Sequence, residues 1–158
     1  MDPAPDLKKS FRTTVIASGA MLISLFFYVL MVELAKSQLR PFRGIVSSGV
    51  RSQTLRYVFF GAAVLAVVLV RIAGRARLKS TPGESFVHLL SRLSRTAVTA
   101  AALAELPAVL GFLLFLLTGL SRDFYVLLFC SLVLEFIYFP RLRDWQDIVR
   151  ESFPQQAV

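Results

Sequence analysis

The chain has 158 residues, of which 56% are hydrophobic, and its mean hydropathy is +0.65. Soluble domains usually contain about 45–50% apolar residues, and the excess here lies in long runs, which argues against a soluble domain and predicts an integral membrane protein. The net charge is +8. Because the basic residues lie almost entirely outside the apolar runs, we expect contact with anionic lipid headgroups and no binding of nucleic acid. The single cysteine, Cys130, allows no intramolecular disulfide.

The N-terminal residues 1–12 are predicted to form a disordered basic flank, since they combine two prolines with Lys8, Lys9 and Arg12. The apolar run that follows, 15–32, is longer than the core of a signal peptide, which has about 7–15 residues. It suits a membrane span, which needs about 20. We therefore expect a first transmembrane helix at about 13–35, with Glu33 as a hydrated charge at its far end.

A second span is expected at about 56–73. Its apolar core, 57–70, is short for a membrane crossing, but Arg56 and Arg71 can reach toward the headgroups from its two ends. A buried helix of the soluble type is the alternative. Crossing is favoured because it keeps the charge distribution of the connections consistent.

Residues 80–120 are typical of one long helix. Thr81, Pro82 and Glu84 have the order of an N-cap, a first helical residue and the third residue of a capping box. The first turns are amphipathic and basic, and they lead into a third span at about 96–120. A tight turn at 118–123 then predicts an antiparallel pair with a fourth span at 124–139.

These segments predict an all-α membrane domain, 13–140, with four transmembrane helices in two antiparallel hairpins. An amphipathic cytoplasmic segment, 141–158, follows. Lys and Arg are more numerous at the termini and in the second connection than on the other side, so the positive-inside rule places both termini in the cytoplasm of a bacterial inner (plasma) membrane. The residues expected to contact the lipid surface are Arg75, Arg77, Lys79, Arg141, Arg143 and Trp145.

The chemistry-bearing residues are few. No catalytic triad, phosphate-binding loop or metal-ligand spacing is present, so we expect no enzyme, no cofactor and no metal. Glu105 lies near the middle of the third span, where an ionised carboxylate costs at least about 2.5 kcal/mol. It must be protonated, paired or directed into a polar cavity. Pro107 should kink the helix and free the carbonyl of Leu103, while Glu135 is interpreted as an interfacial charge.

Small residues mark one side of the third span and predict a packing seam, because they let another backbone approach closely. The seam consists of Ala97, Ala101, Ala104, Ala108 and Gly111. The remaining Phe- and Leu-rich surface, including Leu114, is expected to face lipid. Two roles stay open for Glu105: a protonated group that hydrogen-bonds a neighbouring helix, and an ion- or proton-binding residue.

The segment AALAELPAVLGFLLFLL, 101–117, resembles the proton-carrying helix of the ring subunit of rotary ATPases. The resemblance implies an ion-carrying role for Glu105 alone. Ring subunits pair this helix with a glycine-rich helix, which is not found here. The whole chain is similar to small uncharacterised four-span bacterial proteins, which imply no activity. The sequence therefore predicts a non-enzymatic structural or accessory subunit that associates with itself or with other membrane subunits. The alternative is a proton- or cation-linked transport component.

Overall fold

The computed structural model describes residues 3–39, 44–45, 49–76 and 85–152. This part of the chain is helical and contains no strand, which confirms the all-α fold. The helices are α1 (Pro3–Gln38), α2 (Gly49–Ala76), α3 (Phe86–Thr118), α4 (Ser121–Tyr138) and α5 (Leu142–Ser152).

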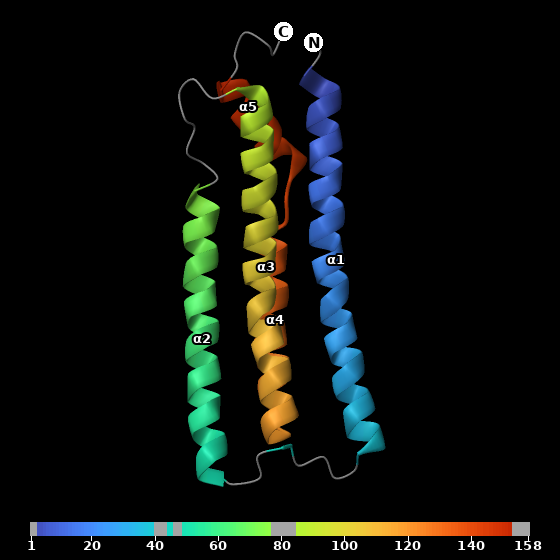
Figure 1. Cartoon of the computed structure of the whole chain (residues 1–158), viewed down its shortest axis with the longest axis vertical. Coiled ribbons are helices and arrows are strands. Elements are labelled where there is room, and N and C mark those ends of the chain that lie inside the picture. The colour runs from blue at the N-terminus through green and yellow to red at the C-terminus, as the bar shows by residue number, and fades with distance from the viewer. Residues whose placement is uncertain (1–2, 40–43, 46–48, 77–84, 153–158) are drawn as a thin grey trace.

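The third helix is the centre of the bundle. α3 packs against α1, α2 and α4, and it lies between α1 and α2 in Figure 1. Successive long helices alternate in direction, so the start of α1 and the whole of α5 lie at the same end of the bundle (Figure 1). α3 and α4 form a packed antiparallel hairpin, as predicted. α1 and α2 are also antiparallel, but they have few contacts with each other, so the first expected hairpin is not a packed pair.

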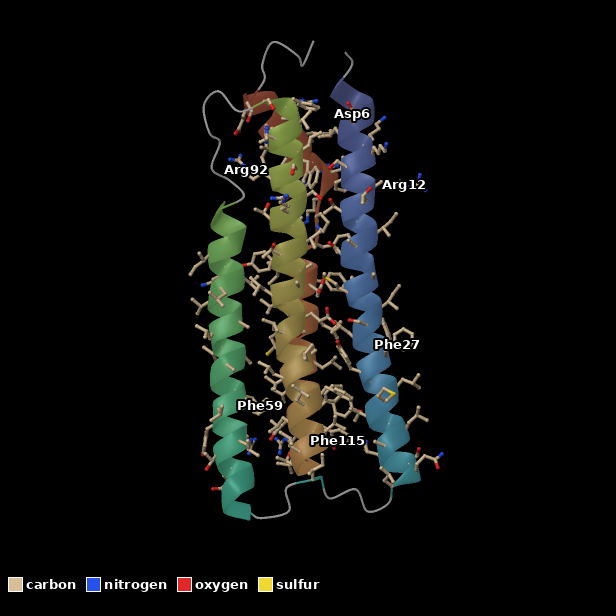
Figure 2. The ribbon with its side chains drawn as sticks, in the orientation of Figure 1. Asp6, Arg12, Phe27, Phe59, Arg92 and Phe115 are labelled. Atoms are coloured by element: carbon tan, nitrogen blue, oxygen red, sulfur yellow. The ribbon has the colours of Figure 1, made fainter. Side chains whose placement is uncertain are left out.

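Among the residues that the structure describes, three helical segments are long and apolar enough to cross a membrane: Asp6–Gln38, Gln53–Ile72 and Phe86–Thr118. α4 and α5 together make a fourth if this pair, bent by 42°, counts as one span. Large apolar side chains cover the outer faces of the outer helices; Phe26 on α1 is 72% exposed and Phe136 on α4 is 74% exposed. In Figure 2, Phe27 points away from the bundle. Soluble monomers rarely expose apolar surface on this scale, so the surface suits a lipid environment.

The N-terminal flank differs from its prediction. Residues 3–12 belong to α1, and Leu7 is buried. Proline is tolerated in the first turn of a helix, where the missing N–H has no intrahelical partner. The apolar side chains of Leu7 and Phe11 pack against α3 and α5, so tertiary contacts stabilise a segment whose composition suggested disorder.

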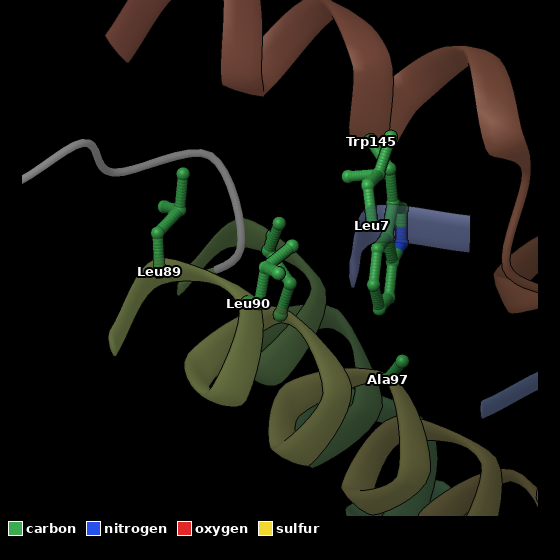
Figure 3. Packing of buried hydrophobic residues seen from close by; sticks show 6 residues of the cluster. Leu7, Leu89, Leu90, Ala97 and Trp145 are labelled. Carbon is green, nitrogen blue, oxygen red and sulfur yellow. The ribbon is translucent and has the colours of Figure 1, made fainter. Parts of the chain in front are cut away.

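We call the group of buried residues at this end the end cluster: Leu7, Leu89, Leu90, Leu93, Ala97 and Trp145 (Figure 3). Trp145 of α5 is only 3% exposed, and its ring lies edge-on to Phe11 with centroids 5.5 Å apart. The expected lipid-surface contact of Trp145 is therefore corrected to a protein contact, because α1 extends far enough to cover it. Arg141 and Arg143 are exposed. The side chains of Arg75, Arg77 and Lys79, and the expected helix start at Thr81, lie outside the described residues.

The turn between α3 and α4 is as tight as predicted. Gly119 has a φ of +75°, a backbone conformation that favours glycine, and its N–H donates to the carbonyl of Phe115 at 2.7 Å. Gly44 has the same φ and packs on this turn, where the N–H of Ile45 donates to the carbonyl of Leu116 at 3.2 Å. Part of the first connection is thus held against the α3–α4 turn.

Candidate functional site

The polar centre of the bundle is Glu105, which lies on α3 and is partly buried. One of its carboxylate oxygens, Oε1, accepts hydrogen bonds from Ser24 and from Tyr28, the latter at 2.9 Å. Both donors belong to α1. They are four residues apart, so they lie one turn apart on the same helix face. A hydrogen bond between Glu105 and a neighbouring helix, one of the two roles left open by the sequence, is consistent with this geometry.

Ser24 has two acceptors within reach. Its Oγ lies 2.6 Å from the carbonyl oxygen of Met21, and it also contacts Glu105 Oε1. A serine hydroxyl carries one proton and can donate to one of them at a time. If Ser24 donates to Met21, its contact with Glu105 requires that the carboxyl group is the donor and is therefore protonated.

A second carboxylate lies near the first. Glu135 on α4 is 1% exposed and lies one helical turn beyond Ser131, whose Oγ is 3.4 Å from the carbonyl oxygen of Glu105. Its Oε1 is buried without a hydrogen-bond partner among the residues that the structure describes. The interpretation of Glu135 as an interfacial charge is thus corrected, because α4 turns this side chain inward. The signal in the sequence was its spacing of four residues from Ser131, which places both on the face that packs against α3.

Ser131 lies beside Pro107. The N–H of Ala108 donates to Ser131 Oγ at 2.8 Å, and that hydroxyl lies 3.4 Å from the carbonyl oxygen of Glu105. α3 is continuous through Pro107. The buried hydroxyl of Ser131 on α4 therefore accepts a hydrogen bond from the α3 backbone at the residue that follows Pro107, within one turn of Glu105. This contact was not predicted, and no described contact links the carbonyl of Leu103 to Glu105.

Hydroxyl groups on α1 form a polar series that was not predicted from the sequence. Thr14 contacts Ser94 of α3 at 2.8 Å, Ser18 is fully buried with no partner for its Oγ in the described structure, and Ser24 and Tyr28 bind Glu105. The positions 14, 18, 24 and 28 lie on one side of a helix. This periodicity, inside an apolar span, was the available signal for a polar face directed at α3.

The small residues of the predicted seam are all buried: Ala97, Ala101, Ala104, Ala108 and Gly111. They meet different partners. Ala104 packs with Val70 of α2 and Leu134 of α4, whereas Ala108 packs with Leu25 of α1. The small residues of the seam therefore pack against helices of the same chain.

Leu114 and Phe115, expected on a lipid-facing surface, are fully buried, because α1, α2 and α4 pack against α3. Figure 2 labels Phe115 on α3.

Two ion pairs lie away from this centre. Arg56 of α2 contacts the buried Asp123 of α4 at 2.9 Å, and Lys36 contacts Glu33 at 2.9 Å at the exposed end of α1. Glu33 also accepts a hydrogen bond from Tyr125. Neither pair involves Glu105 or Glu135. Within the described ranges, no group of three or more His, Cys, Asp and Glu side chains is placed to hold a metal ion.

Comparison of the chain with protein-family models, curated proteins and solved structures gives no match. The fold and the site define a class: within the described residues, an all-helical protein with three to four helices long and apolar enough to span a membrane, with a partly buried carboxylate, Glu105, on the central helix and a buried one, Glu135, on the helix that packs against it. The interpretation of its function rests on this geometry.

Proposed function

We propose that this protein lies in the inner membrane and that Glu105 and Glu135 form a proton-exchanging pair, so that the protein is a component of a proton-linked process. The observation that carries the proposal is the second carboxylate. Glu135 is buried one helical turn from Ser131, which contacts the backbone of Glu105, and its Oε1 has no hydrogen-bond partner in the described part of the chain. Helix association alone accounts for Glu105, but it gives no role to Glu135.

Electrostatics favours a shared proton. Burying one carboxylate charge in a bilayer is costly, and a second charge nearby raises that cost by repulsion. No described ion pair supplies a cation to either group. A proton or a bound cation would therefore supply the missing positive charge.

Ser24 can hydrogen-bond Glu105 in both protonation states of the carboxyl group. With Glu105 ionised, Ser24 and Tyr28 can both donate to Oε1; with Glu105 protonated, the carboxyl group can donate to Ser24, which then donates to Met21. In this change Glu105 takes up one proton, which Glu135 or water supplies, and the hydroxyl proton of Ser24 rotates from Glu105 toward the carbonyl of Met21. Both states keep α1 bound to α3, so proton exchange does not require the helices to separate.

The membrane location is supported by the apolar outer faces of α1, α2 and α4. The start of α1 and α5 share one end of the bundle (Figure 1), as an even number of crossings requires. Lys and Arg counts place this end in the cytoplasm. Exposed α1, α2 and α4 surfaces are available for self-association or for other membrane subunits.

A purely structural subunit is the second candidate. It is favoured by the hydrogen bonds from Ser24 and Tyr28 to Glu105, which join α1 to α3. Interhelical hydrogen bonds in membranes contribute about 0.6–2 kcal/mol. In this case Glu105 acts as a fixed, protonated packing group and exchanges nothing.

The test uses the full chain in liposomes and a hydrophobic carbodiimide, which modifies protonated carboxyl groups within the bilayer. Because the reagent reacts with protonated carboxyl groups, we expect its modification of Glu105 or Glu135 to fall as the pH is raised, together with proton flux measured by a dye in the vesicle lumen. Glu105→Gln and Glu135→Gln should each reduce the flux. Glu33→Gln is the matched control, since Glu33 also accepts a tyrosine hydrogen bond but lies at an exposed helix end.

The structural candidate predicts different results. Proton flux would be the same in Glu105→Gln, in Glu135→Gln and in the unsubstituted chain. The extent of carbodiimide modification would not change with pH. Glu105→Leu would still lower the free energy of unfolding, because it removes both hydrogen bonds to α1. That combination of results would reject proton exchange and leave a packing role.

A further inference from the structure

A cavity of about 330 Å³ opens between α1 and α4, near the break that precedes α5. It is lined by Leu22, Phe136, Phe139 and Arg141. Its volume lies within the range of small-molecule sites, about 300–1,000 Å³. Three apolar side chains with one guanidinium group suit a ligand that has an apolar body and an anionic end.

A second, smaller cavity of about 50 Å³ lies between the same two helices and is wholly apolar. Its lining residues are Leu25, Phe26 and Val29 of α1 with Leu128 and Leu132 of α4. Leu25 lies about one turn beyond Leu22 on α1, and Leu132 lies one turn before Phe136 on α4. The two cavities therefore follow each other along the α1–α4 contact, away from Arg141. We call them together the α1–α4 groove.

The charged end of this groove lies at a suitable depth. α4 has 18 residues, which span about 27 Å, close to the hydrocarbon thickness of about 30 Å. Arg141 follows the end of α4 by three residues, so in a bilayer its side chain would lie at the level of the headgroups. The rest of the groove would lie at the level of the acyl chains.

Arg141 is available for a ligand. It is exposed, and its guanidinium makes no ion pair or hydrogen bond with any other residue that the structure describes. A guanidinium has five N–H donors in a planar arrangement, which matches the geometry of a phosphate group. The apolar surface below it, on Phe136 and Phe139, offers no competing charge.

We propose that the α1–α4 groove binds one anionic phospholipid, with its phosphate on Arg141 and one acyl chain along the apolar lining. The proposal rests on the membrane location proposed above, but it is independent of proton exchange at Glu105. It differs from general attraction to a basic surface, because it assigns the lipid to one groove and one arginine.

The probe is phosphatidylglycerol with a photoreactive diazirine in its acyl chain, added as a trace to nanodiscs of phosphatidylcholine that contain the full chain. Labelled peptides are located by mass spectrometry. We expect labelling of residues 22–29 and 128–139. Arg141→Gln should reduce it about fivefold, as expected for one basic residue at an anionic headgroup. Arg143→Gln, which removes a charge that is also exposed but does not line the groove, should have little effect.

A second pair of variants separates groove occupancy from charge. Leu22→Trp fills the larger cavity and should reduce the labelling, whereas Ile23→Trp, at a neighbouring exposed position, should not. Equal labelling by a photoreactive phosphatidylcholine, or equal loss in Arg141→Gln and Arg143→Gln, would overturn the proposal. Cross-links that join two copies of the chain through residues of this groove would also overturn it, because a second copy would then occupy the groove. Because Glu105→Gln should retain full lipid labelling, failure of the groove and failure of proton exchange can be told apart.

Discussion

A Cβ atom on Gly111 of α3 would stand only 2.9 Å from the Cβ of Leu127 on α4. It would also lie 3.3 Å from the Cα of Phe124, so the obstacle includes backbone that cannot easily move. Gly111 therefore marks a place where α3 and α4 approach so closely that a Cβ atom does not fit between them. It belongs to the small-residue seam on α3.

Gly111→Ala should destabilise the protein by about 1–3 kcal/mol, the usual cost of overpacking a filled interior. The measurement is the free energy of unfolding in a mixed micelle. Gly61→Ala and Gly19→Ala are matched controls, because no atom lies within 4 Å of a Cβ at either position. In those helices the change should be neutral or stabilising by up to about 1 kcal/mol. Equal effects at all three positions would contradict close packing at Gly111.

The pair Arg56–Asp123 should hold α2 against α4. Asp123 has a side chain only 4% exposed, whereas Arg56 is half exposed. Removing one partner of a buried pair costs about 3–5 kcal/mol, and the exposure of Arg56 lowers our expectation for Arg56→Gln to about 1–3 kcal/mol. Lys36→Gln, which breaks an exposed pair with Glu33, should cost less than about 1 kcal/mol. A similar loss in both variants, measured by unfolding, would argue against a structural role for Asp123.

The sole tryptophan provides a direct test of the end cluster. Because Trp145 is buried against Phe11 and Leu7, its fluorescence should be quenched little by lipids that carry bromine on their acyl chains. The control is Phe136→Trp in a Trp145→Phe background, since Phe136 is 74% exposed on α4 and should be quenched strongly. Strong quenching of Trp145 itself would restore the lipid-surface contact expected from the sequence.

The topology can be tested with introduced cysteines in a Cys130→Ser background. Ile45 lies against the α3–α4 turn, where its N–H donates to the carbonyl of Leu116, and Glu151 lies on α5, at the other end of the bundle (Figure 1). A membrane-impermeant maleimide should label Ile45→Cys in intact cells and Glu151→Cys only after the membrane is opened. This result follows if the Lys- and Arg-rich end is cytoplasmic. Labelling of both positions from the same side would exclude the four-span arrangement.

The sequence predicted those features that depend on local patterns. The long apolar helices and the turn at Gly119 follow from run length and from a glycine in a left-handed conformation. Burial of Glu135 and Leu114 did not follow, because both depend on which helix covers which face. The extension of α1 to Pro3 depends on Leu7 meeting side chains some eighty residues away in the sequence. The partners of Glu105 were not predicted either, since they lie on α1 and α4.

The central position of α3 has a consequence for synthesis. α1 and α2 have few contacts with each other, and each packs mainly on α3. Chains emerge from the ribosome N-terminus first, so in the membrane location proposed above the first two helices would enter the bilayer as separate, unpaired segments. They would stay unpaired until α3 arrives and brings Glu105 to Ser24. Assembly of the bundle and formation of the carboxylate site are therefore the same late event, and a chain truncated before α3 would have neither.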